Sequence, residues 1–402
     1  MRRTIIMLSL SGLLLLNCDN KPIFIKESPL IESSITAIKI EHKPKYSAFD
    51  ISAILDTVKF VKLELTEESL IGNINKVIVF EDRIYVLDTR TYSLFVFNID
   101  GEYLFKISKI GKGPEEYIQL DFFDIDYVNR QIVLTDLMGY WILRYDLKGN
   151  YISRQKIPFW IEGIVPIFDK GVVVYANHRD NKRKIKQEYN IFYLDSLMQI
   201  LKAYFPYNSS NFKNPRIKFS TPQEGSFYMY NKNMHFFSAF KNQVYQVAED
   251  GLKPKYSFDF EGKVFNEKYL NQKNKLKKYM DKGDFYRLGY VLENDDFVIF
   301  SFYQNSLRIG HFGYYSKNSR KVICSTGFTV GKNNYFYGYN IAAYDSWIIT
   351  KIQPDQLLSW SKYIDKKKTH LNNKYTILKK HAADGITLDD NPLLMFYKLK
   401  PF

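Results

Sequence analysis

The sequence contains few cysteines and histidines, which are the residues of disulfide frameworks and of many metal sites and catalytic centres. It has two cysteines and six histidines among 402 residues. None of the histidines shows the i, i+4 or HxH spacing that is typical of metal ligands. No catalytic triad, nucleophile elbow or paired glutamate motif is recognisable. We therefore identify no cofactor or metal site, and the core must stabilise the fold without a disulfide framework.

The N-terminus has the features of an export signal. Two arginines precede an apolar run at residues 5–16, which is too short to cross a bilayer comfortably. The run ends in Leu-Leu-Asn-Cys, which resembles a bacterial lipoprotein signal, although Asn17 stands where Gly or Ala is commoner. We predict that residues 1–17 are a lipoprotein signal peptide and that Cys18 carries a lipid anchor. An ordinary signal peptide with an incidental cysteine is the alternative.

The composition indicates a β-rich protein with a basic surface. Aromatic residues make up 17% of the chain, with 32 Tyr and 31 Phe, and they favour strands over helices. The formal net charge is +14, but an exported protein does not meet nucleic acid, so we expect no nucleic-acid partner. The lysine runs are typical of solvated surfaces, and a polyanion or glycan role is the alternative. We expect an outer-membrane lipoprotein that faces the periplasm or is exposed on the cell surface.

Short strands repeat along the chain after a polar tether, which we assign to residues 18–49. Alternating apolar residues predict four strands in the first repeat, at 76–80, 83–88, 93–98 and 102–107. The pattern returns 48 residues later without a gap, since Arg83–Asp88 matches Gln131–Asp136 and the Asp100-Gly101 turn matches Lys148-Gly149. A four-stranded unit that repeats at this period is typical of a β-propeller blade, because each sheet buries both faces only against neighbours.

Residues 50–402 hold about six such units, so we predict an all-β, six-bladed β-propeller of four-stranded antiparallel blades. A closed ring needs its first and last blades joined. We therefore expect residues 58–65 to pair with residues 393–400. Helical patterns at 266–282 and 354–364, the second continuing at 375–383, predict insertions on a propeller face that connect blades.

Three sequence features resemble the six-bladed β-propeller lipoproteins of Bacteroidetes, which are NHL-like propellers of unknown function. The first is the loop Gly111–Tyr117, in which Glu115 replaces a glycine that is usual in the family. The second is Asp389–Pro392 before the last strand, and the third is the Tyr-Val-Leu-Asp and Asp-Gly-Glu-Tyr pattern of the first blade. The resemblance implies the fold and export, and it implies no established activity.

Candidate ligand-binding residues fall into two groups. Asp88 and Asp136 end equivalent strands, so both are expected at a channel mouth as ligands for a cation or polar molecule, or as acceptors for backbone N–H groups in their turns. Exposed aromatic clusters with amide neighbours suit flat ligands such as sugars, and the alternative is packing between blades. These clusters contain Tyr335, Tyr337 and Tyr339, and Tyr228 and Tyr230.

Two functions from different classes follow. The first is a binding or scaffold module that recognises a glycan, a peptide or a partner protein through a propeller face. The second is a propeller enzyme, a lyase or hydrolase, with a metal at the channel mouth assembled from several blades. Because no catalytic motif is recognisable, we favour the binding module.

Overall fold

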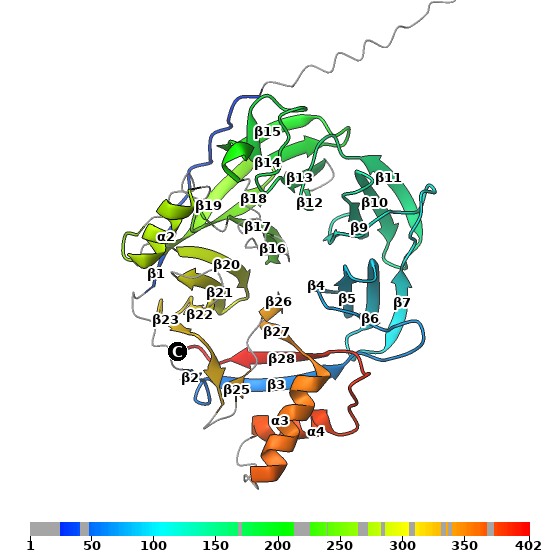
Figure 1. The fold of residues 1–402 in the computed structure, drawn as a ribbon, viewed down its shortest axis with the longest axis vertical. Helices are drawn as coiled ribbons and strands as arrows, with labels where there is room; N and C mark the ends of the chain where they lie inside the picture. The colour runs from blue at the N-terminus through cyan, green and yellow to red at the C-terminus, as the bar shows by residue number, and fades with distance from the viewer. Residues whose placement is uncertain are drawn as a thin grey trace, which may run out of the picture.

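Six four-stranded antiparallel sheets form a closed ring in the computed structural model (Figure 1). The predicted six-bladed β-propeller is therefore confirmed. The structure describes residues 25–40, 48–167, 171–212, 226–238, 240–263, 272–282, 286–304, 310–330, 335–336, 340–367 and 374–402. The predicted signal peptide and Cys18 lie outside the described residues.

Each of the first five blades is a run of four consecutive strands, with the first strand nearest the axis. Blade A consists of β4 (Lys76–Phe80), β5 (Arg83–Asp88), β6 (Ser93–Asn98) and β7 (Tyr103–Ile107). Blade B consists of β8 (Phe122–Asp126), β9 (Gln131–Asp136), β10 (Trp141–Asp146) and β11 (Tyr151–Lys156). Blade C is β12 (Gly163–Ile167), β13 (Gly171–Tyr175), β14 (Glu188–Asp195), β15 (Ile200–Tyr207). Blade D consists of β16 (Phe227–Tyr230), β17 (Asn233–Ser238), β18 (Gln243–Ala248) and β19 (Gly251–Asp259). Blade E consists of β20 (Tyr286–Glu293), β21 (Phe297–Gln304), β22 (Gly310–Ser316) and β23 (Val322–Ser325).

Blade F closes the ring with strands from both ends of the propeller. It consists of β26 (Asn340–Tyr344), β27 (Trp347–Ile352), β28 (Leu393–Leu399) and β3 (Leu55–Lys62). β28 pairs antiparallel with β3, so that Leu394 lies opposite Val61. The predicted pairing between the two ends of the propeller is confirmed. Blade F is therefore complete only when β3, which precedes blade A in the chain, pairs with β28 near the C-terminus.

The alternation of residues along each strand explains how the blades stack. In β5, Ile84 and Val86 pack in a core cluster with blade F. The intervening Tyr85 and Leu87 pack in a cluster with blade B. Because side chains point to opposite faces in turn, one strand fills two interfaces between blades. Burial of each such side chain contributes about 1.5–3 kcal/mol.

Residues 25–40 run along the outer edges of blades C and D, as the dark blue trace in Figure 1 shows. β1 (Thr36–Lys39) adds a fifth, parallel strand to blade D by pairing with β19. Ser28 N also donates to Ala203 O in blade C, at 2.8 Å. This part of the predicted tether is therefore attached to the propeller.

The helices lie outside the ring. α2 (Lys273–Asp281) precedes blade E, as predicted, and residues 264–271 lie outside the described residues. α3 (Pro354–Lys367) and α4 (Lys374–Ala383) were predicted to connect blades, which is wrong, because both lie between β27 and β28 of blade F. α4 packs on β3 there. None of the helices in the described ranges combines the length and apolar character needed to cross a membrane.

Two short elements complete the described fold. The 3₁₀ helix η2 (Ser209–Phe212) follows blade C. A small sheet joins β2 (Phe49–Asp50), β24 (Phe328–Thr329) and β25 (Tyr335–Phe336). Its parallel pairing of β2 with β24 fastens the start of the propeller to the segment after blade E.

Candidate functional site

A cavity of about 670 Å³ opens along the axis of the ring. Among the described residues, its walls come from β4, β8, β16, β20 and β26, the innermost strands of five blades, from the turns that follow them and from β17. The innermost strands of neighbouring blades contact one another, which brings side chains far apart in the sequence to one place. The cavity is therefore the site at which the propeller topology concentrates chemically varied residues.

Five tyrosines of the described part of the chain line this cavity: Tyr127, Tyr228, Tyr230, Tyr290 and Tyr344. Tyr228 is buried, whereas Tyr230 and Tyr344 at the ends of their strands are partly exposed. Aliphatic side chains of β4, β20 and β26 fill the wall between the rings. The surface thus combines apolar faces with hydroxyl groups, which suits a ligand that has both.

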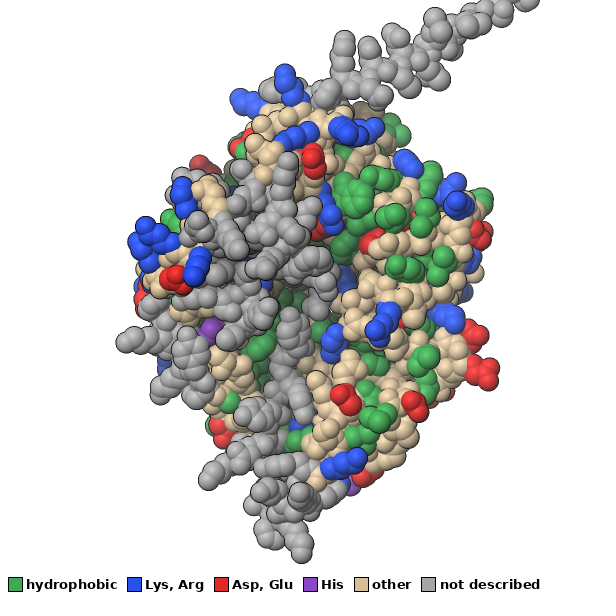
Figure 2. All heavy atoms as spheres, viewed as in Figure 1, with side chains coloured by type: hydrophobic (Ala, Val, Ile, Leu, Met, Phe, Trp, Pro, Cys, Tyr) green, Lys and Arg blue, Asp and Glu red, His purple; other side chains and the backbone are tan. Residues whose placement is uncertain are grey.

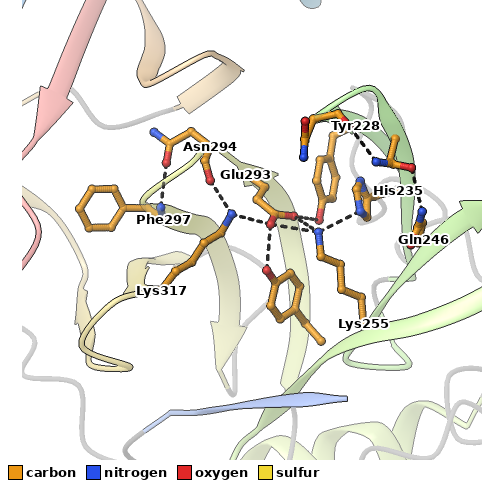
Figure 3. Close-up of polar contacts among 11 residues, drawn as sticks. Tyr228, His235, Gln246, Lys255, Glu293, Asn294, Phe297 and Lys317 are labelled. Atoms are coloured by element: carbon orange, nitrogen blue, oxygen red, sulfur yellow. Dashed lines mark hydrogen bonds and ion pairs between the residues drawn. The ribbon is translucent and has the colours of Figure 1, made fainter. Parts of the chain in front are cut away.

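A buried carboxylate anchors the wall between blades D and E (Figure 3). The side chain of Glu293, the last residue of β20, is fully buried. Its oxygens accept hydrogen bonds from Lys255 Nζ at 2.9 and 3.0 Å, Tyr256 OH at 2.8 Å and Tyr228 OH at 3.1 Å. Lys317 Nζ forms a second ion pair at 2.7 Å. A buried charge requires such partners, and here one carboxylate receives two ammonium groups and two hydroxyls.

The two lysines also hold the ring of Tyr230. Lys317 Nζ lies 3.8 Å and Lys255 Nζ 4.9 Å from the ring centroid. Such cation–π contacts contribute about 0.5–2 kcal/mol when partly desolvated. Burial, helped by the charge of Glu293, raises the pKa of Tyr230 to about 12, so the phenol stays protonated and can donate a hydrogen bond. The cluster therefore fixes the position of a cavity-lining ring.

Charge in this cluster is set by mutual pairing. Burial alone would raise the pKa of Glu293, but the ammonium groups of Lys255 and Lys317 outweigh it and hold that pKa below its ordinary value. Burial and the neighbouring Lys255 lower the pKa of His235 to about 3. A neutral His235 can accept a hydrogen bond from Lys255 Nζ, 3.0 Å from its Nε2. His235 also stacks on Tyr228, with centroids 5.0 Å apart.

Other polar groups of the cavity are paired within the wall. Lys76 Nζ forms an ion pair with Asp124 at 2.8 Å, across the interface between blades A and B. Asn340 Nδ2 donates to Tyr290 OH at 3.1 Å, and Tyr397 OH donates to Asn340 Oδ1 at 2.7 Å. Among the described residues, no group of three His, Cys, Asp or Glu side chains is arranged to hold a metal ion.

A family profile matches residues 35–398, which is most of the chain. The chain belongs to the family described as Domain of unknown function (DUF4934). A search of the curated proteins finds no match to this chain.

Solved structures that resemble this one include several bacterial proteins. A Bacteroides fragilis protein named for its inferred export superposes with a TM-score of 0.71 at 20% identity, covering 91% of this chain and 100% of that one. A Bacteroides vulgatus protein of the DUF4221 family has a TM-score of 0.44 at 9% identity, over 86% and 97% of the two chains. Virginiamycin B lyase from Staphylococcus aureus has a TM-score of 0.40 at 10% identity, over 73% and 80%. At these identities the likenesses concern the fold alone.

In this DUF4934 member the predicted tyrosine pair of blade D lies in the cavity wall, as described above. Tyr335 belongs to β25, in the small sheet that joins β2 and β24. Tyr337 and Tyr339, like Cys18, lie outside the described residues.

Asp88 and Asp136 are buried in equivalent turns and accept backbone hydrogen bonds. Asp88 accepts from Arg90 N at 2.8 Å and from Gly72 N at 2.7 Å, which ties its turn to the loop before blade A. Asp136 accepts from Gly139 N at 2.8 Å and from Ile118 N at 2.9 Å, in the same way for blade B. Neither aspartate lines the cavity. Of the two roles expected for them, this geometry favours the acceptor role in the turns.

Sequence reasoning missed Glu293, Lys255 and Lys317. They lie on β20, β19 and the turn after β22, and no short motif contains two of them. Their strands carry other charged residues as well, Lys253 in β19 and Arg287 in β20, so no charge pattern marks Lys255 or Glu293. The contact itself arises from stacking blade D on blade E.

Proposed function

We propose that this protein is an exported, lipid-anchored binding module whose central cavity takes a saccharide of one or two rings. The observation that carries the proposal is the set of five cavity-lining tyrosines among the described residues, contributed by blades B, D, E and F. Rings with hydroxyl groups are suited to sugars, because the apolar face of a sugar stacks on them while its hydroxyls form hydrogen bonds.

The size of the cavity supports a small ligand. About 670 Å³ falls within the range of roughly 300–1,000 Å³ that is usual for small-molecule sites. Polar groups at the rim could orient such a ligand. Asp295, Asp345 and Lys232 line the cavity and are exposed, so carboxylates and an ammonium group are available to sugar hydroxyls.

The N-terminal sequence supports the location that we propose. The short apolar run and Cys18 have the order of a lipoprotein signal. The similar Bacteroides fragilis protein was also named for inferred export. An acyl chain contributes about 0.8 kcal/mol per buried CH₂, so two or more chains hold a protein firmly on a membrane. A binding module held in this way would collect its ligand at the outer membrane.

Saccharide binding is tested on an array of bacterial and host glycans, followed by calorimetry with the best binder. Tyr344→Ala removes a partly exposed cavity ring, and we expect affinity to fall at least about fivefold, which corresponds to about 1 kcal/mol. The matched control is Tyr151→Ala, which removes a partly exposed ring at the outer edge of blade B. Absence of any binder, or equal losses in the two variants, would refute the proposal.

A further inference from the structure

The N-terminal segment leaves the propeller at one defined place, the end of blade C where β14 begins and β15 ends. Tyr189 OH donates to Ile25 O at 2.9 Å, and Phe205 N donates to Glu27 Oε1 at 3.3 Å. Ile25 is seven residues after Cys18. A fully extended chain spans at most about 3.6 Å per residue, so a lipid on Cys18 holds this end within about 25 Å of the membrane.

A basic loop lies at the same end of blade C. The loop between β13 and β14 contains four exposed cations, Lys182, Arg183, Lys184 and Lys186, and we call residues 182–186 the basic loop. Its position is fixed beside the end of β15, since Lys182 Nζ donates to Asn208 Oδ1 at 2.9 Å. Figure 2 shows Lys and Arg side chains gathered over this end of the molecule, at the top of the view.

The basic loop is held in a defined conformation by buried groups. Ile185 is fully buried in the core of blade C, so the cations on either side of it point outward. Asn181, also buried, accepts the backbone N–H of Lys184 at 2.8 Å through its carbonyl. The buried carboxylate of Glu188 accepts from Asn181 N at 2.8 Å and Ser209 N at 2.9 Å. The conformational entropy of the loop is therefore lost when the protein folds, and binding of a partner does not have to order the loop.

We propose that the basic loop binds the anionic lipid headgroups of the membrane that carries the Cys18 anchor. The inference rests on the lipid anchoring proposed above. Lys26, also exposed, adds a cation near the exit point. Asp180, Glu188 and Glu27 are the acidic neighbours in sequence, so the five cations still leave an excess of positive charge. Each Lys or Arg near an anionic surface contributes about 1 kcal/mol, or about fivefold in binding. The anchor supplies proximity, and the loop selects which end of the propeller faces the lipid.

The test is amine-reactive footprinting of the mature lipidated protein in vesicles. Vesicles of phosphatidylcholine are compared with vesicles that contain phosphatidylglycerol, and labelling of each lysine is read by mass spectrometry. We expect lysines of the basic loop to label about fivefold more slowly on the anionic vesicles. The exposed lysines Lys277, Lys278 and Lys282, in and after α2, are the internal control and should label equally on both.

A variant separates charge from mere proximity. In Lys182→Gln/Arg183→Gln/Lys184→Gln, Lys186 should lose its protection, whereas the control Lys277→Gln/Lys278→Gln/Lys282→Gln should keep it. High salt should also abolish the protection, because it screens exposed charges. Equal labelling of the basic loop on both vesicles, with Cys18 acylated in the mass spectrum, would overturn this inference alone. An unmodified Cys18 would overturn both the anchoring and the inference.

Discussion

Replacing Glu293 by glutamine is the sharpest test of how the cavity wall is held. The substitution keeps the shape of the side chain and removes its negative charge. In the native protein this fully buried group pairs with both Lys255 and Lys317. Glutamine would leave two ammonium groups facing each other across a neutral amide. The wall between blades D and E should therefore lose its charge balance while the fold of each blade stays the same.

The expected loss in the free energy of unfolding is about 3–5 kcal/mol, the range for breaking a buried ion pair by removing one partner. The matched control is Asp295→Asn, an exposed carboxylate two residues further on, for which we expect less than about 1 kcal/mol. Adding Lys255→Met to Glu293→Gln should recover part of the loss, because one unpaired cation is then removed as well. Urea denaturation followed by tryptophan fluorescence measures all four proteins.

The same variant should change the response to acid. Because the folded-state pKa of Glu293 is lowered, its contribution to stability is present above the ordinary value of 4.5 and is lost as the pH falls below it. Glu293→Gln lacks this component, so its stability should decline less steeply below that pH. A variant as stable as the native protein, with an unchanged acid profile, would refute our account of the cluster.

A deletion and a further substitution test the ring and its turns. Deleting residues 393–402 removes the strand that pairs with β3, so the cooperative thermal transition should disappear. The control deletion of residues 401–402 should preserve that transition. Calorimetry measures both proteins, and a normal transition in the longer deletion would contradict ring closure. Gly101 has a φ of 96°, and a Cβ there would lie 2.1 Å from Lys62 O. Gly101→Ala should lower the free energy of unfolding in urea by at least about 1 kcal/mol. The control Gly327→Ala, with open space around the added Cβ, should lower it little. Equal effects would contradict the role of Gly101 in the turn.

The fold was predictable because blades A and B repeat without a gap. Their strands carry apolar residues at alternate positions, which is the pattern that packing between two neighbouring blades requires. Blade C departs from the repeat because a long loop, residues 176–187, separates β13 from β14. The same loop is the one that carries four exposed cations. Thus the pattern weakens where the blade has acquired a feature that stacking does not need.

The attachment of residues 25–40 was not predictable from alternation. In β1 only Ile38 is buried, so the segment lacks the two-sided apolar pattern of an inner strand. Its pairing with β19 is parallel, and hydrogen bonds to backbone leave no mark on side-chain composition. A single apolar residue among polar ones is equally typical of a linker, which is how we interpreted it.

Repetition itself separates scaffold from site in this protein. The aspartates that close the turns after β5 and β9 recur in blades A and B because each ties its turn to the loop before its blade. By contrast, the last residue of the innermost strand varies among the blades. It is Phe80 in blade A, Ile167 in blade C and tyrosine at positions 230 and 344 in blades D and F. In blades B and E it is a buried carboxylate, and Asp126 of blade B accepts the backbone N–H of Asn129 in its own turn at 2.9 Å. Blade stacking does not require a buried carboxylate at that position, since aromatic residues fill it elsewhere. Glu293 differs from Asp126 because it pairs with lysines of other strands, Lys255 and Lys317, and they in turn fix Tyr230 in the cavity wall. A residue near the axis that differs from its equivalents in the other blades is therefore a better guide to function than a residue that recurs from blade to blade.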